Sequence, residues 1–292
     1  MKIVECIPNF SEGRDEAVLA ALREAAGTAL LDVHADKDHN RSVFTLAGSP
    51  EDMAEVAFKM AQTAVRLIDL NRHKGEHPRM GAVDVIPFVP IRNADMADCV
   101  TLARQVGERI AKELILPVFL YEEAAKSPDR RNLADIRRGG FEGMAEKIRM
   151  PEWEPDYGGC TPHPTAGVVA VGARKPLIAF NINLDTPDIK VAKAIAKAVR
   201  GSSGGLRYCK ALGMLLHERN IAQVSMNLVD YEQTPIYRVF QLVSAEAERY
   251  GVRIIGSELI GLAPAKAMMD CAEYFLQIKG FKMNEHILEF KL

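Results

Sequence analysis

The residues best suited to chemistry lie in one short glycine-bounded stretch, Gly75–Gly81 (GEHPRMG). It combines the carboxylate of Glu76, the imidazole of His77 and the guanidinium of Arg79. Histidine titrates near neutrality, so His77 could take up and release a proton at working pH. Because a proline follows it, its backbone is restricted to extended conformations. An ordinary exposed loop would also contain such residues, so the stretch is a candidate active site that needs support from the rest of the chain.

A second group of polar residues could instead hold a metal ion. His34, Asp36, Asp38 and His39 lie within six residues of one another, and histidine and carboxylate side chains are common ligands of transition metals. The pattern resembles the H-x-H-x-D-H string of dinuclear metallohydrolases, except that Asp36 stands where the second histidine should be. Aspartate also suits turns. We therefore favour a polar hairpin turn and predict no metal, while a metal-dependent hydrolase stays an alternative.

Several positively charged residues could anchor an anionic ligand. Arginine is the natural bidentate partner of a carboxylate, and Arg41 follows Asn40 directly after the polar turn. Arg174 and Lys175 lie near the midpoint of the chain. Although a single arginine is usually a surface residue, these positions are candidate anchors. The basic stretch from Arg130 to Arg138 is instead interpreted as a solvated helix face.

A long irregular segment rich in glycine and proline occupies residues 150–167. Loops of that length inside compact chains are often functional, and small residues let a flat ligand approach the backbone. A simple linker is the competing interpretation. The residues concerned are Gly158, Gly159, Cys160, Thr161, Pro162, His163, Pro164, Thr165, Ala166 and Gly167.

Composition and charge exclude several classes of protein. The 292 residues are 48% hydrophobic and 26% charged, with a net charge of −2, which is ordinary for a globular protein and gives no sign of nucleic-acid binding. The five cysteines are scattered without a CxxC pair, so we expect reduced thiols in the cytoplasm. The N-terminus does not resemble a signal peptide. No apolar run approaches the roughly 20 residues of a membrane helix.

The order of strand-like and helix-like segments indicates an α/β (α+β) fold with two lobes. Each half of the chain reads β-α-β-β-α-β, the ferredoxin-like order, and we expect a mixed sheet in each lobe with helices on the outer faces. The predicted domains are residues 1–173 and 177–292, with a ligand cleft between them. The first half is predicted to contain Lys2–Ile7, Asp15–Ala26, Ala29–His34, Ser42–Ala47, Pro50–Leu70 and a strand from Val83, and a helix at about Ala94–Glu113 and a strand at Pro117–Tyr121 extend it. The second is predicted to contain Leu177–Leu184, Thr186–Val199, Arg207–His217, Ile221–Val229, Pro235–Tyr250 and Val252–Leu259.

Three motifs in fixed order resemble a known family. Val4–Gly13 (VECIPNFSEG), Gly75–Gly81 and Gly172–Leu184 (GARKPLIAFNINL) look like the signatures of glutamate formimidoyltransferases (glutamate formiminotransferases). The resemblance extends over nearly the whole chain. In vertebrate members the module is fused to a cyclodeaminase, and the present chain resembles the stand-alone form. It departs from the vertebrate pattern at His34, where those members carry aspartate.

The resemblance implies a reaction and a set of site residues. The family transfers the formimino group of N-formimino-L-glutamate to N5 of tetrahydrofolate, a step of histidine degradation and one-carbon metabolism, and the resemblance also implies a homodimer. The resemblance places the catalytic histidine at His77 and a folate-contacting loop at Gly158–Gly167. Tetrahydrofolate is then a co-substrate, and no metal, nucleic acid or membrane is required. Candidate residues for substrate binding are His34, Asn40, Arg41, Glu76, Arg79, Arg174 and Lys175.

The chemistry of such a transfer suits a single imidazole. The attacking nitrogen must lose a proton and the leaving amine must gain one, and a group that titrates near neutrality can do both in turn. Both substrates carry carboxylates, which explains why arginine and lysine residues would accompany the histidine. The motifs do not separate formimino from formyl donors, so a glutamate formyltransferase that uses 5-formyltetrahydrofolate stays a second alternative.

Overall fold

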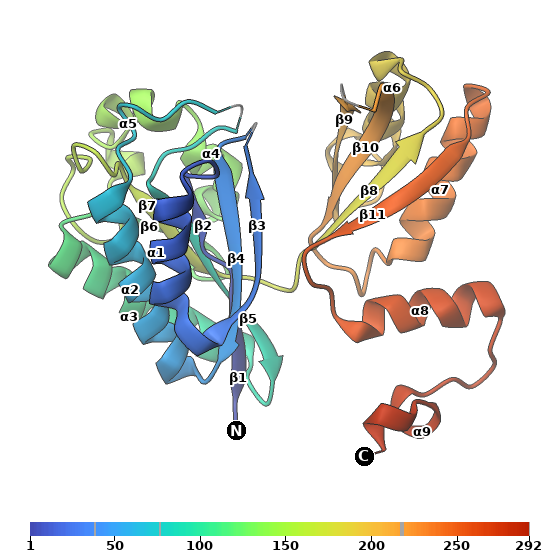
Figure 1. The fold of residues 1–292 in the computed structure, drawn as a ribbon, viewed down its shortest axis with the longest axis horizontal. Helices are drawn as coiled ribbons and strands as arrows, with labels where there is room; N and C mark the ends of the chain where they lie inside the picture. Colours follow the sequence, from blue (N-terminus) through green and yellow to red (C-terminus); the bar gives the residue numbers. More distant parts are fainter. Residues whose placement is uncertain (38, 76, 217–218, 292) are drawn as a thin grey trace. The chain divides into compact units, whose positions relative to one another are not determined.

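The structure is a computed structural model that describes residues 1–37, 39–75, 77–216 and 219–291 (Figure 1). The chain divides into two compact units, Met1–Arg174 and Lys175–Leu292. Each unit has its own hydrophobic core, the first around Phe10, Phe44 and Phe88 and the second around Ile182 and Val224. Among the described residues, no helix has both the length and the apolar composition that crossing a bilayer requires.

The first unit begins with the predicted β-α-β-β-α-β order and continues beyond it. Its strands are β1 (Ile3–Cys6), β2 (Asn9–Phe10), β3 (Leu30–Asp36), β4 (Arg41–Gly48), β5 (Val83–Arg92), β6 (Val118–Glu122) and β7 (Val169–Ala173). Its α-helices are α1 (Glu16–Ala26), α2 (Pro50–Leu67), α3 (Met96–Leu114), α4 (Leu133–Arg137) and α5 (Gly140–Lys147).

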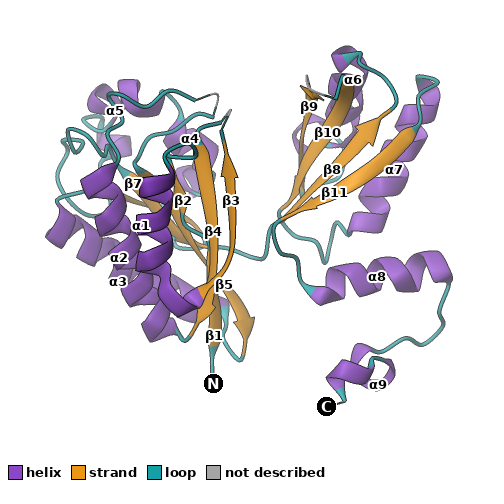
Figure 2. Ribbon diagram, in the orientation of Figure 1, coloured by secondary structure: helices purple, strands orange, loops and turns teal. Residues whose placement is uncertain are grey.

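These strands form one mixed sheet (Figure 2). β1 and β2 follow each other between β4 and β5, and β3 lies outside β4, so that β3, β4, β1/β2 and β5 are antiparallel neighbours. This is the strand arrangement of a ferredoxin-like fold. β7 then pairs parallel with β5, and β6 pairs parallel with β7. Because β6 and β7 join this sheet, the chain segments before and after β6 lie at the same sheet as the Gly75–Gly81 loop.

Helices α1, α2 and α3 cover one face of this sheet (Figure 1). Their first turns show why they begin where they do. Asp15 caps α1 by accepting the amides of Ala17 and Val18, and Ser49 caps α2 ahead of Pro50; an oxygen-bearing cap followed by proline is a common helix start. Each helix then buries one apolar stripe, which packs against the strands and fixes the sheet on which the polar residues lie.

The second unit repeats the ferredoxin-like order with an antiparallel sheet. Its strands are β8 (Ile178–Leu184), β9 (Cys209–Leu216), β10 (Ile221–Leu228) and β11 (Ile254–Ile260), in the spatial order β11-β8-β10-β9. Every pair in it is antiparallel, so this sheet is not mixed, unlike the first. Its α-helices are α6 (Ile189–Val199), α7 (Ile236–Arg249), α8 (Ala265–Leu276) and α9 (Met283–His286). The end of the strand predicted to reach His217 lies outside the described residues.

The sheet face of the second unit that points away from its core carries polar side chains. Alternate residues of β8 point to opposite faces, so Ile182 lies in the core while Asn183 faces the other way. Asn183 accepts a hydrogen bond from Gln223 and donates one to Glu258, with both N–O distances 2.8 Å. Arg219 donates to the same carboxylate at 2.6 Å. Three neighbouring strands are thus joined by a satisfied polar network.

Candidate active site

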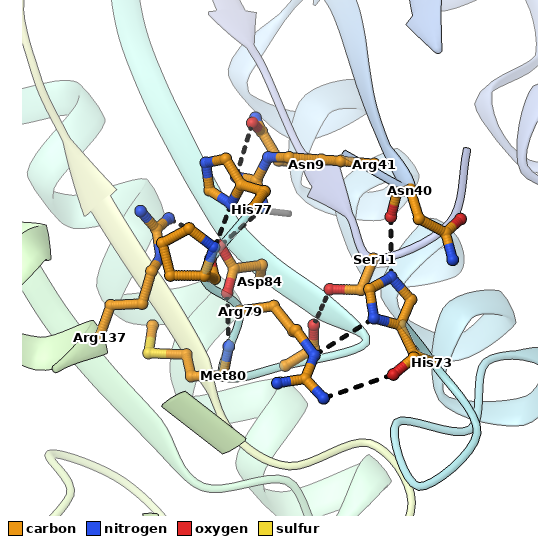
Figure 3. Close-up of polar contacts among 12 residues, drawn as sticks. Asn9, Ser11, Asn40, Arg41, His73, His77, Arg79, Met80, Asp84 and Arg137 are labelled. Atoms are coloured by element: carbon orange, nitrogen blue, oxygen red, sulfur yellow. Dashed lines mark hydrogen bonds and ion pairs between the residues drawn. The ribbon is translucent and has the colours of Figure 1, made fainter. Parts of the chain in front are cut away.

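A buried carboxylate with two arginines forms the centre of the candidate site (Figure 3). Asp84 lies on β5 and is fully buried. Its Oδ2 accepts from Arg41, at the start of β4, at 3.0 Å and from Arg137, at the end of α4, at 2.6 Å. Its Oδ1 accepts the backbone amide of Met80 at 2.9 Å. Asn9 accepts the other end of the Arg41 guanidinium at 2.9 Å. Four separate segments of the first unit therefore meet here.

Burial and the two neighbouring guanidinium groups shift the pKa of Asp84 in opposite directions. Burial acts to raise the pKa of Asp84, but the guanidinium groups of Arg137 and Arg41 outweigh it and lower the pKa to about 2. Burial also lowers the pKa of Arg41. Two guanidinium groups against one carboxylate leave one positive charge in excess, in a place that water reaches poorly. Such a site attracts an anionic group.

His77 lies beside these charges and is half-buried. Its Nδ1 is 2.7 Å from the carbonyl oxygen of Pro78. A carbonyl can only accept, so Nδ1 carries the hydrogen and donates it, and the lone pair is left on Nε2. Burial first, and then the positive charges of Arg41 and Arg137, lower the pKa of His77 to about 3. The imidazole is therefore neutral at physiological pH, which is the form that can accept a proton.

A second polar group holds the loop that carries His77. His73 is buried and donates through Nε2 to the carbonyl of Asn40 at 2.8 Å, while its Nδ1 accepts from Arg79 at 3.2 Å. Arg79 also donates to both carboxylate oxygens of Glu142, at 2.9 Å and 2.7 Å. Burial lowers the pKa of His73. In this arrangement His73 and Arg79 brace the loop.

Asn40 connects the turn after β3 with the same loop. Its backbone is left-handed, with φ at 46°, a conformation that asparagine tolerates better than most residues. Its side chain accepts the amide of Gly13 at 2.9 Å and donates to the carbonyl of Lys74 at 3.1 Å. Gly75 packs so closely that a Cβ there would lie 2.2 Å from the carbonyl oxygen of His39. Glycine is required at this position because no side chain fits.

The segment 158–167 has two parts with different surroundings. Its first residues, including Cys160, are exposed. Its last residues form a turn closed by reciprocal hydrogen bonds between His163 and Gly167, at 2.8 Å and 2.9 Å. Gly167 forms a bridge with Gly81. The turn therefore lies at the end of the Gly75–Gly81 loop.

An open hollow of about 480 Å³ adjoins the bracing residues. It does not include His77, so it lies beside the Asp84 group and does not contain it. Arg79 and Lys74 contribute positive charge to it, and Glu142 contributes negative charge. It is lined by Leu70, Asn71, His73, Lys74, Gly75, Arg79, Phe141 and Glu142.

The remaining residues singled out in the sequence have different surroundings. His34 is exposed on β3. Glu76 lies outside the described residues. Arg174 follows β7 in the first unit, with its backbone amide donating to Phe88 at 3.0 Å. Lys175 opens the second unit and forms a 2.6 Å ion pair with Asp230. The structure thus brings His77 and Arg41 together with Asp84, and keeps His34 at the surface of the same unit.

Sequence reasoning missed two members of the central group. Asp84 stands in an apolar run, and a charged residue within a buried strand is rare unless it is paired; that signal could have identified it. Arg137 lies in the basic stretch that was interpreted as a solvated helix face. For Arg137 this interpretation is wrong, because its side chain is 14% exposed and bonded to Asp84. It is also wrong for Arg130, whose side chain is 12% exposed and paired with Asp156. Arg138, in contrast, is 77% exposed.

The structure offers no support for a metal-dependent hydrolase. Among the described residues, no three histidine, cysteine, aspartate or glutamate side chains are grouped so that they could hold a metal ion. Asp38, one of the four residues in the proposed metal string, is outside those residues. His34 and His39, the two histidines of the string, differ in surroundings, since the first is exposed and the second partly buried.

The fold and the site define a two-unit α/β protein with a neutral histidine beside a buried Arg–Asp–Arg group. Family models for the formiminotransferase domain match both units, the N-terminal subdomain over residues 3–174 and the second part over residues 179–290. The chain belongs to the formiminotransferase family, whose co-substrate is tetrahydrofolate.

Individual relatives agree with that assignment. The chain is 55% identical to a glutamate formimidoyltransferase of Streptococcus pyogenes, covering 99% of this chain and 98% of that protein. It is 46% identical to a glutamate formimidoyltransferase of Thermoplasma acidophilum, covering 100% and 98%. It is also 46% identical to a formimidoyltransferase-cyclodeaminase of Gallus gallus, covering all of this chain and 56% of that protein.

Proposed function

We propose that this protein transfers the formimino group from N-formimino-L-glutamate to N5 of tetrahydrofolate, giving 5-formiminotetrahydrofolate and L-glutamate. One observation carries the proposal. His77 has its Nε2 lone pair available beside an excess positive charge, in a chain 55% identical over nearly its full length to a glutamate formimidoyltransferase.

The proposed mechanism uses His77 twice. N5 of the folate attacks the formimino carbon, a new C–N bond forms, and Nε2 of His77 takes the proton that N5 loses. The tetrahedral adduct then collapses, the bond from that carbon to the glutamate nitrogen breaks, and the imidazolium returns the proton to the leaving amine. Protons and bonds balance without any further reactant. A well-placed acid–base group of this kind typically contributes about 10²–10⁴-fold.

Charge explains how an imidazole of such low pKa could hold a proton during the reaction. Arg41 and Arg137 disfavour the imidazolium in the free protein. A substrate carboxylate placed near them would offset part of that positive charge and raise the pKa of His77. Substrate binding therefore makes His77 a stronger base. Holding the two substrates together supplies the remaining acceleration.

We assign the other predicted residues according to their surroundings. Arg41 attracts a substrate carboxylate through the net positive charge of the group formed by Arg41, Asp84 and Arg137. Asn40 and Arg79 hold the His77 loop, and Arg79 also faces the adjoining hollow. We propose the segment Gly158–Gly167 as the folate-contacting loop, since its final turn adjoins the Gly75–Gly81 loop. Arg174 and Lys175 remain proposed carboxylate anchors, and the exposed His34 a proposed substrate contact.

We further propose that the protein acts in the cytoplasm as a homodimer, in histidine degradation and one-carbon metabolism. The support is the shared family and the scattered cysteines, which suit a reducing compartment. Light scattering coupled to gel filtration measures the mass in solution. A single species at the mass of one 32.2 kDa chain would contradict the dimer.

The function is tested by supplying formiminoglutamate and formylglutamate in parallel, each with tetrahydrofolate, and following the folate product spectrophotometrically. We expect turnover of the formimino donor. His77→Ala should lower kcat about 10²–10⁴-fold and leave folate binding in place, whereas His286→Ala, an exposed histidine of the second unit, serves as the matched control. Wild-type rates in His77→Ala would exclude its acid–base role, and turnover of the formyl donor alone would favour the formyltransferase.

A further inference from the structure

A second imidazole lies against His77. The rings of His39 and His77 meet edge to face, with centroids 6.1 Å apart and planes at 88°. His39 belongs to the turn between β3 and β4 and is partly buried. Among the described residues it is not part of any group that could hold a metal ion. Its position beside the proposed base calls for another explanation.

The backbone of His39 makes two close contacts with neighbouring residues. Its amide donates to Asp36 at 2.8 Å, and its carbonyl oxygen packs against Gly75, where a Cβ would approach to 2.2 Å. The next residue, Asn40, is fixed by its bonds to Gly13 and Lys74. These contacts of residues 39 and 40 fix the backbone from which the His39 ring reaches His77, and a functional side chain needs such positioning.

The ring nitrogen Nδ1 of His39 is buried and has no hydrogen-bond partner among the described residues. Buried polar atoms are nearly always paired, and one left unpaired often marks a functional site or an absent ligand. Arg137, which also adjoins His77, has a buried Nε in the same condition. Two unpaired buried nitrogens therefore lie on side chains that border the proposed base.

We propose that His39 is a second substrate-contacting residue of this site, whose Nδ1 forms a hydrogen bond with the nitrogen of the one-carbon group beside Nε2 of His77. The inference depends on the function proposed above. An imidazole nitrogen can donate or accept according to its tautomer, and an imino nitrogen offers both possibilities. Such a bond would orient the formimino carbon toward N5 while His77 moves the proton, and it would pair an atom that is otherwise buried alone.

The test compares substitutions that retain or move the polar atom. Asparagine at position 39 places an amide near the position of Nδ1, glutamine places it one carbon further out, and alanine removes it. We expect His39→Ala and His39→Gln to lower kcat/KM roughly tenfold, the effect of one hydrogen bond, and His39→Asn to stay within about threefold of wild type. Leu31→Ala, an exposed residue of β3, is the control for general effects on this hairpin.

The outcomes separate the inference from the proposed function. An unchanged kcat/KM in all three His39 variants would overturn the inference while the function stands. Equal losses in all three, accompanied by a lower thermal midpoint, would show a purely structural role and also overturn it. A wild-type protein that does not transfer the formimino group would refute the proposed function, and the role of His39 in it.

Discussion

The substitution Asp84→Asn examines the central claim that one buried carboxylate holds two arginines in place. In the wild-type protein the amide of Met80 donates to Asp84 at 2.9 Å. Asparagine has nearly the same shape as aspartate and keeps an oxygen that can accept this hydrogen bond. It removes the negative charge. Arg41 and Arg137, with side chains 10% and 14% exposed, would then lie close together without a counter-charge.

The size of the effect follows from the structure. The pKa of Asp84 falls from an ordinary 3.8 to about 2, and at ~1.36 kcal/mol per pKa unit this corresponds to about 2 kcal/mol in favour of the charged form. Removing one partner of a buried ion pair typically costs about 3–5 kcal/mol, because the other charge stays buried and unpaired. We therefore expect the free energy of unfolding of the first unit to fall by about 3 kcal/mol.

The single tryptophan provides the assay. Trp153 belongs to the first unit and packs against a buried cluster of that unit that includes Ile136 and Met80, so its fluorescence during urea unfolding reports on that unit. Glu123→Gln makes the same chemical change in an exposed pair, in which Arg131 lies 2.7 Å away; such pairs contribute about 0–1 kcal/mol. A loss in Asp84→Asn no larger than in Glu123→Gln would refute the reasoning.

Two further predictions concern the acid side of the pH profile. Only the neutral imidazole can accept a proton, and burial together with the neighbouring charges lowers the pKa of His77 to about 3, so kcat/KM should stay level as pH falls through 6.5; an acid limb centred near 6.5 would contradict this. Arg137→Met removes one of those charges and should move the acid limb to higher pH, measured against Arg149→Met at an exposed position; an unmoved limb would show that Arg137 does not influence the base.

Much of the fold could be predicted from the sequence because its signals are local. The segment Pro50–Leu70 was predicted in the first half, and the structure has α2 at Pro50–Leu67. The β-α-β-β-α-β order of each half is confirmed. The strand predicted at Pro117–Tyr121 corresponds to β6 (Val118–Glu122). Strand β7 and its parallel pairing with β5 were not predicted, because that pairing joins residues more than 80 positions apart. No local pattern reports which distant strand is the neighbour.

The site was predicted in part for the same reason. His77 and Arg41 stood out because their immediate neighbours are unusual. Arg137 did not, because its partner Asp84 is 53 residues away, and its sequence neighbour Arg138 is as exposed as the basic stretch suggested. Whether an arginine is solvated or buried depends on what the chain brings to it. A charged residue inside an apolar run, such as Asp84, is the one sequence signal that predicts a buried partner of opposite charge.

The burial of these charges also explains why the imidazole is neutral in the free protein. If Asp84 were paired with Arg41 alone, the group would be close to neutral and His77 would carry a proton more readily. The second guanidinium adds a positive charge, which lowers the pKa of His77 and favours the entry of an anion. The same charge that keeps the base free of protons therefore also attracts the substrate whose carboxylates would offset it. Proton transfer and substrate binding are thus coupled through the Arg41–Asp84–Arg137 group.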